Sequence, residues 1–297
     1  MKRLVLSALL AGAAWATATV AAPATGNSST TSAKPASPPP LSFAACQKRY
    51  AVTGLPKMKS DGSDDGPLAL CRAGYAVAFN PDTRVPDWVI ERLPLDWLSG
   101  DAQRKDNFHA DTDVDKAMAD EGKGPQTTDY KKSGYDQGHQ APAGDFKSSQ
   151  DMTNQSFLLT NMAPQVGVGF NRNIWKQLET DVRGWILCGG RKELYVVTGP
   201  VFDDGDGKWL KKRVRVPDAF FKVIYDAENK RALGMLLPNK KLNTADLPNY
   251  AVPISDIEDK TGIVFFPALT KRQQNLLKNS TAALWGDDDT CTKDASE

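Results

Sequence analysis

The residues best suited to chemistry gather in one polar stretch near the middle of the chain. His139 lies among glycine and other small residues within residues 135–146 (YDQGHQAPAGDF). Two more polar segments follow, residues 160–165 (TNMAPQ) and residues 170–175 (FNRNIW). An imidazole, carboxamides, carboxylates and a guanidinium thus lie close together in the sequence. Neither a cysteine nucleophile nor a G-x-S-x-G motif accompanies them.

This set of residues suits the hydrolysis of a phosphodiester bond. A neutral imidazole can take a proton from water near neutral pH. A hard cation held by oxygen ligands can neutralise charge on phosphorus and on the leaving oxygen. The chain has only two histidines, His109 and His139, which argues against a metal centre built from several imidazoles. The residues therefore indicate a hydrolase with one histidine and one oxygen-ligated cation.

Three ordered blocks resemble the signature motifs of the DNA/RNA non-specific endonucleases, a family that includes endonuclease G and secreted bacterial nucleases with a ββα-metal site. Residues 136–145 read DQGHQAPAGD, where the family has DRGH. TNMAPQ matches the family's (S/T)N-hydrophobic-(A/T)PQ, and FNRNIWKQLE of residues 170–179 matches N-x-x-x-W-x-x-L-E. The similarity runs from about Tyr75 to Leu269.

The resemblance implies a metal-dependent cleavage of DNA and RNA. By position, His139 resembles the general base that activates water, and Asn171 resembles the side chain that ligates the metal directly. Glu179 resembles the carboxylate that holds a metal-bound water. The family's metal is Mg²⁺, for which Mn²⁺ can substitute, and its products carry 5′-phosphate ends.

Four further positions receive roles from the same resemblance. Asn161 resembles a supporting polar residue, Arg183 a cation that steadies the phosphate, and Asp136 a residue that orients the motif. Gln137 stands where the family has arginine. A neutral amide replaces a planar cation there, which weakens the expected phosphate contact.

Several of these residues also have a purely structural interpretation. Asn171 is well placed to be the N-cap of the helix that follows. Glu179 and Arg183 are four residues apart and could form an ordinary surface pair on a helix. Asn161 could serve only to satisfy backbone groups. The basic residues of the segment 208–215 could follow a nucleic-acid backbone or simply belong to an exposed strand.

Two other functions compete with the nuclease hypothesis. The replacement at Gln137 could mark a catalytically weakened or inactive nucleic-acid-binding member of the same fold. Alternatively, His109, His139 and Asp145 could hold zinc in a peptidase or amidase acting on cell walls, although no H-E-x-x-H motif is present. Nuclease assays with Mg²⁺, Zn²⁺ or a chelator discriminate among the three.

The elements around these motifs predict an α+β fold with a mixed, largely antiparallel sheet, in which the resemblance implies a ββα-metal motif. The clearest helix is expected over residues 171–187, where apolar residues recur at helical spacing and Gly189 and Gly190 follow. Residues 107–135 indicate a long polar loop with one helical turn. The expected strands cover residues 74–79, 156–161, 194–197, 213–216, 220–225 and 232–237. Shorter helices are expected at residues 86–93 and after capping boxes at 255–258 and 270–273.

Length and composition are those of an ordinary globular protein. The chain has 297 residues, 40% of them hydrophobic and 25% charged, with a formal net charge of +1. These values exclude a disordered or fibrous chain and a wholly basic nucleic-acid coat.

The first residues resemble a targeting segment. Residues 1–22 have a basic start, an uncharged and mostly apolar run and then small residues near Ala18–Ala22, which is typical of a cleaved signal peptide. An uncleaved membrane anchor is the alternative, although about 17 residues is short for a span. Residues 23–42 are rich in Pro, Ser and Thr and predict a flexible linker. We therefore expect a periplasmic or secreted protein with one nuclease domain over residues 43–297 and no stable membrane association.

Cysteine usage agrees with export. The chain has four cysteines, an even number that suggests two disulfides in an oxidising compartment. Three pairings are possible, and we favour Cys46–Cys71 with Cys188–Cys291. Buried free thiols are the alternative. Oligomeric state is not indicated by the sequence.

Overall fold

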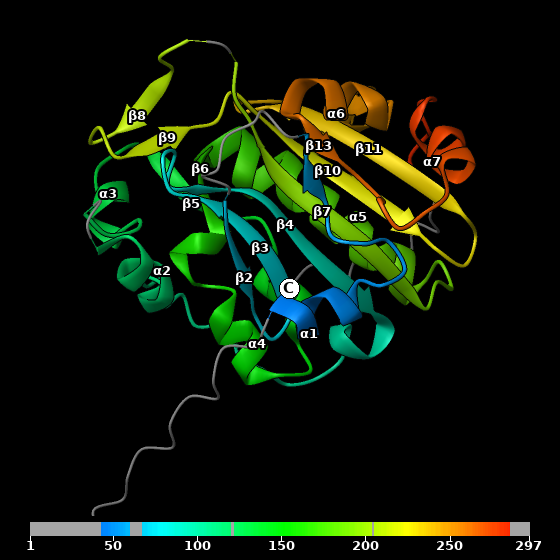
Figure 1. Ribbon diagram of the computed structural model, residues 1–297, viewed down its shortest axis with the longest axis horizontal. Coiled ribbons are helices and arrows are strands. Elements are labelled where there is room, and N and C mark those ends of the chain that lie inside the picture. The colour runs from blue at the N-terminus through cyan, green and yellow to red at the C-terminus, as the bar shows by residue number, and fades with distance from the viewer. Residues whose placement is uncertain (1–42, 60–66, 120–121, 204, 286–297) are drawn as a thin grey trace, which may run out of the picture. The chain divides into compact units, whose positions relative to one another are not determined.

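A seven-stranded antiparallel sheet forms the centre of the fold (Figure 1). The computed structural model describes residues 43–59, 67–119, 122–203 and 205–285. The strands of the sheet, in spatial order, are β12 (Ala251–Val252), β11 (Arg231–Pro238), β10 (Ala219–Asp226), β7 (Glu193–Val201), β4 (Val85–Pro94), β3 (Tyr75–Asn80) and β2 (Leu68–Cys71). Each neighbouring pair is antiparallel, so the predicted largely antiparallel sheet is confirmed.

Three two-stranded pairs accompany the sheet. β5 (Tyr135–His139) pairs with β6 (Met162–Val166), β8 (Lys208–Leu210) with β9 (Val214–Val216), and β1 (Lys57–Met58) with β13 (Ile263–Val264). The α-helices are α1 (Phe43–Arg49), α2 (Thr112–Ala117), α3 (Thr127–Tyr130), α4 (Gln150–Gln155), α5 (Lys176–Leu187), α6 (Ile254–Thr261) and α7 (Lys271–Lys278). The 3₁₀ turns are η1 (Leu95–Leu98), η3 (Ala143–Phe146), η4 (Leu159–Asn161) and η6 (Thr244–Tyr250), and η5 (Gly167–Trp175) is a π-helical segment.

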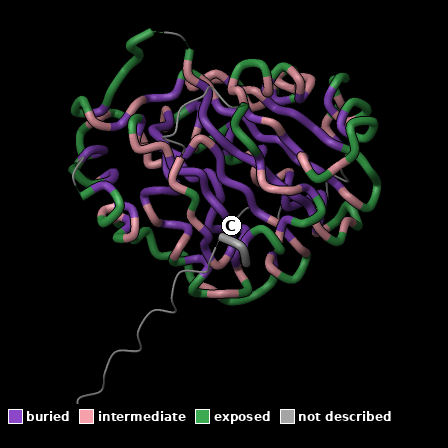
Figure 2. The backbone as a smooth tube through the Cα atoms, viewed as in Figure 1, coloured by how far each residue is buried: buried purple, intermediate pink, exposed green. Residues whose placement is uncertain are grey.

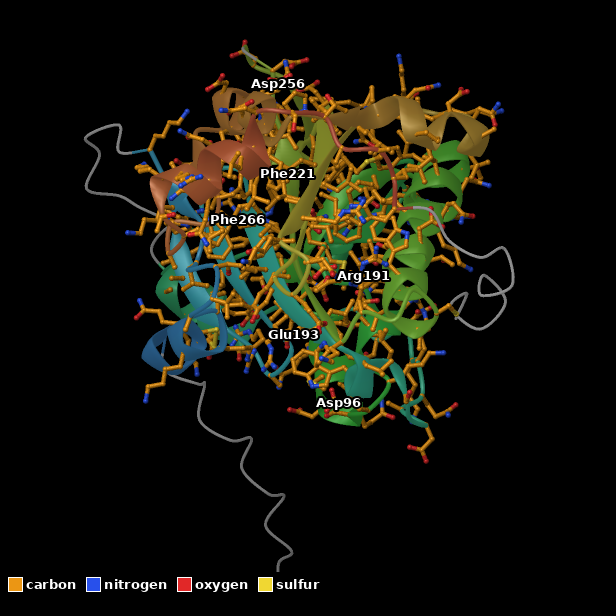
Figure 3. All side chains as sticks on the ribbon, turned by 90° about the vertical axis from the view of Figure 1, so that its right-hand side faces the viewer. Asp96, Arg191, Glu193, Phe221, Asp256 and Phe266 are labelled. Atoms are coloured by element: carbon orange, nitrogen blue, oxygen red, sulfur yellow. A yellow bond between two sulfur atoms is a disulfide. The ribbon has the colours of Figure 1, made fainter. Side chains whose placement is uncertain are left out.

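Both faces of the sheet are covered, because its central strands bury alternate residues on opposite sides. In β10, Phe220 and Ile224 pack with α5, whereas Phe221 and Val223 pack on the other face with the C-terminal helices and Phe265. Figure 2 shows that the central strands are buried and that exposed residues lie in the surrounding turns and helices. In Figure 3, Phe221 and Phe266 lie inside the molecule, while Asp96 and Asp256 lie at its periphery.

The helix expected over residues 86–93 is wrong, because this segment is strand β4. Trp88 and Ile90 are buried on one face of the sheet and Leu93 on the other, so the run is buried on both faces. Such a run does not distinguish a strand from a buried helix by its periodicity. Pro86 is tolerated because it lies at a register shift between β3 and β4.

The strand expected over residues 156–161 is also wrong. These residues leave α4 and continue into η4, and β6 begins only at Met162. The Asn161 amide folds the segment back on itself by donating to the carbonyl of Ser156 at 2.8 Å.

The segment 107–135 holds two short helices, α2 and α3, instead of one turn.

The other expected elements lie close to their predicted places. Strands β3, β7, β9, β10 and β11 cover the predicted cores, and the segment before β9 adds β8, which sequence reasoning missed. The capping box at Thr270 is confirmed. The one expected at Ser255 is wrong, because α6 begins after Pro253 and Ser255 lies in its first turn.

One favoured disulfide is present, between Cys46 in α1 and Cys71 in β2. Cys188 is also disulfide-bonded, and its predicted partner Cys291 lies outside the described residues. The predicted signal peptide and linker lie outside them as well. No helix within the described ranges is long and apolar enough to cross a membrane.

Candidate active site

A hollow of about 990 Å³ lies between the β5–β6 pair, α3, α5 and residues 102–108. Six of the seven predicted site residues line it: Asp136, Gln137, His139, Asn171, Glu179 and Arg183. The lining holds six basic and three acidic side chains, which suits a polyanionic ligand. The basic ones are Arg104, Lys131, Lys147, Arg172, Lys176 and Arg183.

The β5–β6 pair and the following helix form a continuous strand–strand–helix unit that presents the site. β5 carries Asp136, Gln137 and His139, and β6 leads directly into η5 and α5. Gly138 lets the two strands approach, since a Cβ atom there would lie 2.1 Å from Oε1 of Gln165. The buried side chain of Gln165 therefore packs directly against β5 at Gly138.

His139 is held between two aromatic rings at the wall of the hollow. Its ring centroid lies 5.6 Å from that of Phe108 and 5.0 Å from that of Phe157. Its Nε2 is buried and has no hydrogen-bond partner within the described residues. Burial, with the nearby charge of Arg104, lowers the pKa of His139 to about 3. The imidazole is therefore neutral at physiological pH and can accept a proton.

Asn161 does not line the hollow and supports its wall instead. It is fully buried, and its amide donates to the carbonyls of Ala141 and Ser156, each at 2.8 Å. Its Oδ1 accepts from the N–H of Ala141 at 3.0 Å. Both ends of the amide thus bind the backbone that follows His139. The contacts of Asn161 therefore agree with the interpretation that it satisfies backbone groups.

Asn171 is oriented by Asp136, and it is not an N-cap. The Nδ2 of Asn171 donates to Oδ2 of Asp136 at 2.9 Å, and Arg172 completes an ion pair with the same carboxylate at 2.7 Å. These partners hold the pKa of Asp136 below its usual value despite its burial. The backbone is non-helical at Val168 and Gly169, and the residues that follow this kink are already helical before α5 begins. Asn171 therefore lies inside the helical turn, and it is Asn173 whose side chain accepts the N–H of Gly169.

The Asn171 segment also depends on a glycine. Gly169 has φ of 91°, and a Cβ atom there would lie 2.3 Å from the side chain of Lys241. The backbone N–H of Leu242 donates to the carbonyl of Gly169 at 3.1 Å. The loop after β11 is therefore packed directly against the turn that presents Asn171.

Glu179 lies about two helical turns beyond Asn171, next to a group of buried charged residues. Burial raises the pKa of Glu179 to about 7, although the cations Lys222 and Arg183 partly oppose this. The carboxylate is therefore poised to change charge near neutral pH. Arg183 is buried and pairs with Asp145, so the two side chains are not the exposed surface pair that the spacing allowed.

Arg183 is engaged below the surface of the hollow. It is buried, and its Nη1 donates to Oδ1 of Asp145 at 2.7 Å in an ion pair. Its Nη2 lies 3.4 Å from Oγ1 of Thr180. Its predicted contact with phosphate therefore stays a prediction.

Sequence reasoning missed the charges beneath Glu179. Lys222 is buried in β10, its Nζ donates to Oγ1 of Thr198 at 2.7 Å and lies 5.0 Å from the ring of Trp175. Burial lowers the pKa of Lys222, and burial with the neighbouring Asp145 raises the pKa of Glu91 well above its usual value. A lysine inside the apolar run FFKVIY was the available signal, but its partners come from β4 and η3.

Arg104 was also missed. It lines the hollow, its guanidinium lies 5.4 Å from the ring of Phe157, and its charge lowers the pKa of His139. Because it lies on the polar segment before Phe108, only the fold brings it to the histidine. Its signal in the sequence was a single arginine in a loop of mixed charge.

The donors fit a hard cation. With Nδ2 engaged by Asp136, Asn171 keeps its Oδ1 as the remaining amide acceptor, and Glu179 supplies a carboxylate in the same hollow. Amide and carboxylate oxygens are ligands that Mg²⁺ accepts.

Within the described ranges, no three His, Cys, Asp or Glu side chains could together hold a metal ion. His109, His139 and Asp145 thus form no zinc site, and exposed His109 bonds the carbonyl of Asn107.

Comparisons with known proteins agree with this geometry. The sequence model of the DNA/RNA non-specific endonucleases matches residues 53–272. Nuclease C1 of Cunninghamella echinulata var. echinulata is 38% identical over an alignment of 216 residues, and the match covers 67% of this chain and 83% of that protein. Mitochondrial endonuclease G of Bos taurus is 33% identical over an alignment of 243 residues, and the match covers 77% of this chain and 75% of that protein.

The fold is similar to a solved structure as well. A chain of the crystal structure of the EndoG/EndoGI complex, which addresses the mechanism of EndoG inhibition, superposes with a TM-score of 0.61 and 30% sequence identity. The match covers 71% of this chain and 91% of that chain. The expected strand–strand–helix nuclease architecture is consistent with this likeness.

Proposed function

The chain belongs to the DNA/RNA non-specific endonuclease family and is a nuclease, and we propose that it is an exported, metal-dependent member that uses His139 as its general base. The observation that carries the proposal is the shared hollow. It joins a neutral histidine with an unpaired Nε2 to an asparagine whose amide is oriented by a carboxylate. Its substrates are DNA and RNA.

His139 accepts the proton of the attacking water in this proposal. As water oxygen bonds to phosphorus, its proton passes to the imidazole, and the bond from phosphorus to the 3′-oxygen breaks. The phosphate then stays on the 5′ end of the product. General base catalysis of this kind contributes roughly 10²- to 10⁴-fold to the rate. The low pKa of His139 keeps the imidazole in its accepting form over the whole neutral range.

Asn171 and Glu179 would hold the cation, Asn171 through its Oδ1 and Glu179 through a bound water. Mg²⁺, with Mn²⁺ as a substitute, would neutralise charge on the phosphoryl group and the leaving oxygen when bound. Asp136 keeps the amide of Asn171 in the required orientation. Arg104 and Gln137, at the same wall, would contact the phosphate.

Export is supported by the signal-peptide pattern of residues 1–22 and by the Cys46–Cys71 disulfide. Disulfides persist in oxidising compartments. We therefore place the protein in the periplasm or outside the cell. A chain that cleaves nucleic acids without sequence choice is safest there.

The products of cleavage test the proposed chemistry. Purified protein is incubated with supercoiled plasmid and with a folded RNA, in Mg²⁺ or in EDTA. We expect nicking and then fragmentation in Mg²⁺ only, with ends that polynucleotide kinase labels only after phosphatase treatment. Ends that are labelled without phosphatase, or cleavage unaffected by EDTA, would contradict the proposal.

A further inference from the structure

A second hollow, of about 260 Å³, adjoins the active site at the start of β5. Tyr135 lines both hollows, and β9 lies against β6 in the same region (Figure 1). The β8–β9 pair and the end of β11 form its other walls, through Lys208, Pro217 and Pro238. A molecule that leaves the active site past Tyr135 therefore meets this second hollow.

Two exposed lysines give this hollow its charge. The Nζ of Lys208 donates to the hydroxyl of Tyr135 at 2.9 Å and lies 4.7 Å from the ring centroid. An ammonium group has three donors, so two remain for another acceptor. Lys240 is exposed on the opposite wall, and Asp218 is the one acidic residue of the lining. The carboxylate of Asp218 already accepts the N–H of Asp203 at 2.9 Å.

The two arginines of the basic segment make contacts that stabilise the fold. Arg213 pairs with Asp129 at 3.2 Å and donates to carbonyls of the loop before α3. Arg215 donates to the carbonyl of Asp203 at 3.0 Å and lies over the ring of Phe202. These contacts hold the β8–β9 pair against its neighbours. Lys208 is the basic residue of this pair that lines the hollow.

Hydrogen bonds of the Asn239 side chain hold the floor of the hollow together. Asn239 donates to the carbonyls of Pro164 and Pro217 at 3.0 and 2.8 Å and accepts the N–H of Val166 at 2.9 Å. Its side chain thereby ties β6 to both walls. Lys240 follows directly and is presented from a fixed backbone, which reduces the entropy lost when it binds an anion.

The length of β5 separates the second hollow from His139. Tyr135 and His139 are the ends of β5, and a strand advances about 3.3 Å per residue, so roughly 13 Å separate them. For a duplex whose axis follows β5, a rise of about 3.4 Å per base pair makes this length equal to about four base pairs. We infer that Lys208 and Lys240 bind a backbone phosphate of the substrate about four nucleotides from the bond that is cut. This inference rests on the proposed function.

The test compares two charge-matched double variants of the full mature protein. Lys208→Gln/Lys240→Gln removes the pair, and Lys260→Gln/Lys271→Gln removes two exposed lysines from α6 and α7. Binding of a labelled DNA duplex of about 24 base pairs is measured by fluorescence anisotropy in EDTA, between about 50 and 200 mM salt. KM is measured in Mg²⁺ on duplexes of about 6, 12 and 24 base pairs.

We expect the Lys208/Lys240 variant to bind the long duplex several-fold more weakly than the control variant. Its plot of log affinity against log salt should be less steep by about one, since the variant loses one phosphate contact and each contact contributes about one. The ratio of the two variants' KM values should fall toward one on the shortest duplex, which reaches only about three nucleotides to either side. Equal affinities and equal salt slopes for the two variants would overturn the inference. Intact binding differences with no cleavage by the wild type would instead refute the proposed function.

Discussion

The Nδ2 of Asn171 donates a 2.9 Å hydrogen bond to Oδ2 of Asp136, and this bond decides which end of the amide stays available. A carboxylate accepts hydrogen bonds and cannot donate them when ionised. The amide oxygen of Asn171 must therefore point away from Asp136. Asp136, in β5, thus determines that the Oδ1 of Asn171 is the atom that the proposed cation would use.

Replacing Asp136 with alanine should lower the affinity of the site for Mg²⁺ while leaving the proposed ligand, Asn171, in place. Residues that orient a metal ligand typically contribute 10- to 100-fold to affinity, so we expect a rise of about that size in the Mg²⁺ concentration for half-maximal activity. Arg172→Gln, which leaves the Asn171 bond intact, should have a smaller effect. Mg²⁺ titrations of both variants check this, and an unchanged midpoint in Asp136→Ala would show that the bond does not matter.

Cation affinity should depend on pH through Glu179. Its pKa is raised to about 7, and the cation prefers the ionised carboxylate. As the pH falls below about 7, protons compete, so the apparent dissociation constant for Mg²⁺ should rise up to tenfold per pH unit. His139 stays neutral in this range and contributes nothing. Calorimetric titrations should show this slope in the wild type and not in Glu179→Gln, and a flat wild-type profile would contradict it.

The fold was predictable where one face of an element is apolar. Residues 171–187 show a single stripe, and the structure confirms a helix there, whereas β4 is buried on both faces and its pattern indicates neither class. Pro86 favoured a helix start, and only the register shift with β3 explains its place in a strand. Asn171 was expected to cap the helix, but the helical residues begin before it, after a kink at Val168 and Gly169 that packs against Lys241, far away in the chain.

The site was predictable as far as its motifs are local. His139, Asn171 and Glu179 belong to short blocks, and the fold brings them to one hollow. Lys222 and Arg104 reach that hollow from other elements, and no spacing in the sequence reports contacts of that kind. Asn161 was predicted near the site, and its full burial among backbone groups became visible only in the fold.

Gln137→Arg restores the family's usual residue in a position that lines the hollow. A guanidinium can make a charge-assisted, bidentate contact with phosphate, worth roughly 1.5–3 kcal/mol against about 1 for a neutral bond. We expect a several-fold higher kcat/KM on a short duplex, with a smaller gain in high salt. Steady-state kinetics at two salt concentrations decide the matter. An unchanged or lower value at both would show that Gln137 is not a weakened phosphate contact.

The Cys46–Cys71 disulfide should stabilise the fold substantially. It closes a loop with a sequence separation of 25 residues and joins α1 to an edge strand of the sheet. Loss of such a bond typically costs about 2–5 kcal/mol. We expect Cys46→Ala/Cys71→Ala to unfold at a lower urea concentration, and reductant to lower the melting temperature and the activity of the wild type. Equal urea midpoints for the variant and the wild type would contradict this.

The role of His139 is the central claim, and single-turnover cleavage of a labelled duplex in saturating Mg²⁺ tests it most directly. His139→Ala is compared with the wild type and with His109→Ala, which removes the exposed histidine outside the hollow. Circular dichroism and the melting temperature verify that each variant is folded. The account predicts that His139→Ala slows the chemical step by roughly 10²- to 10⁴-fold while His109→Ala stays near the wild-type rate. A folded His139→Ala protein that cleaves at nearly the wild-type rate would contradict it.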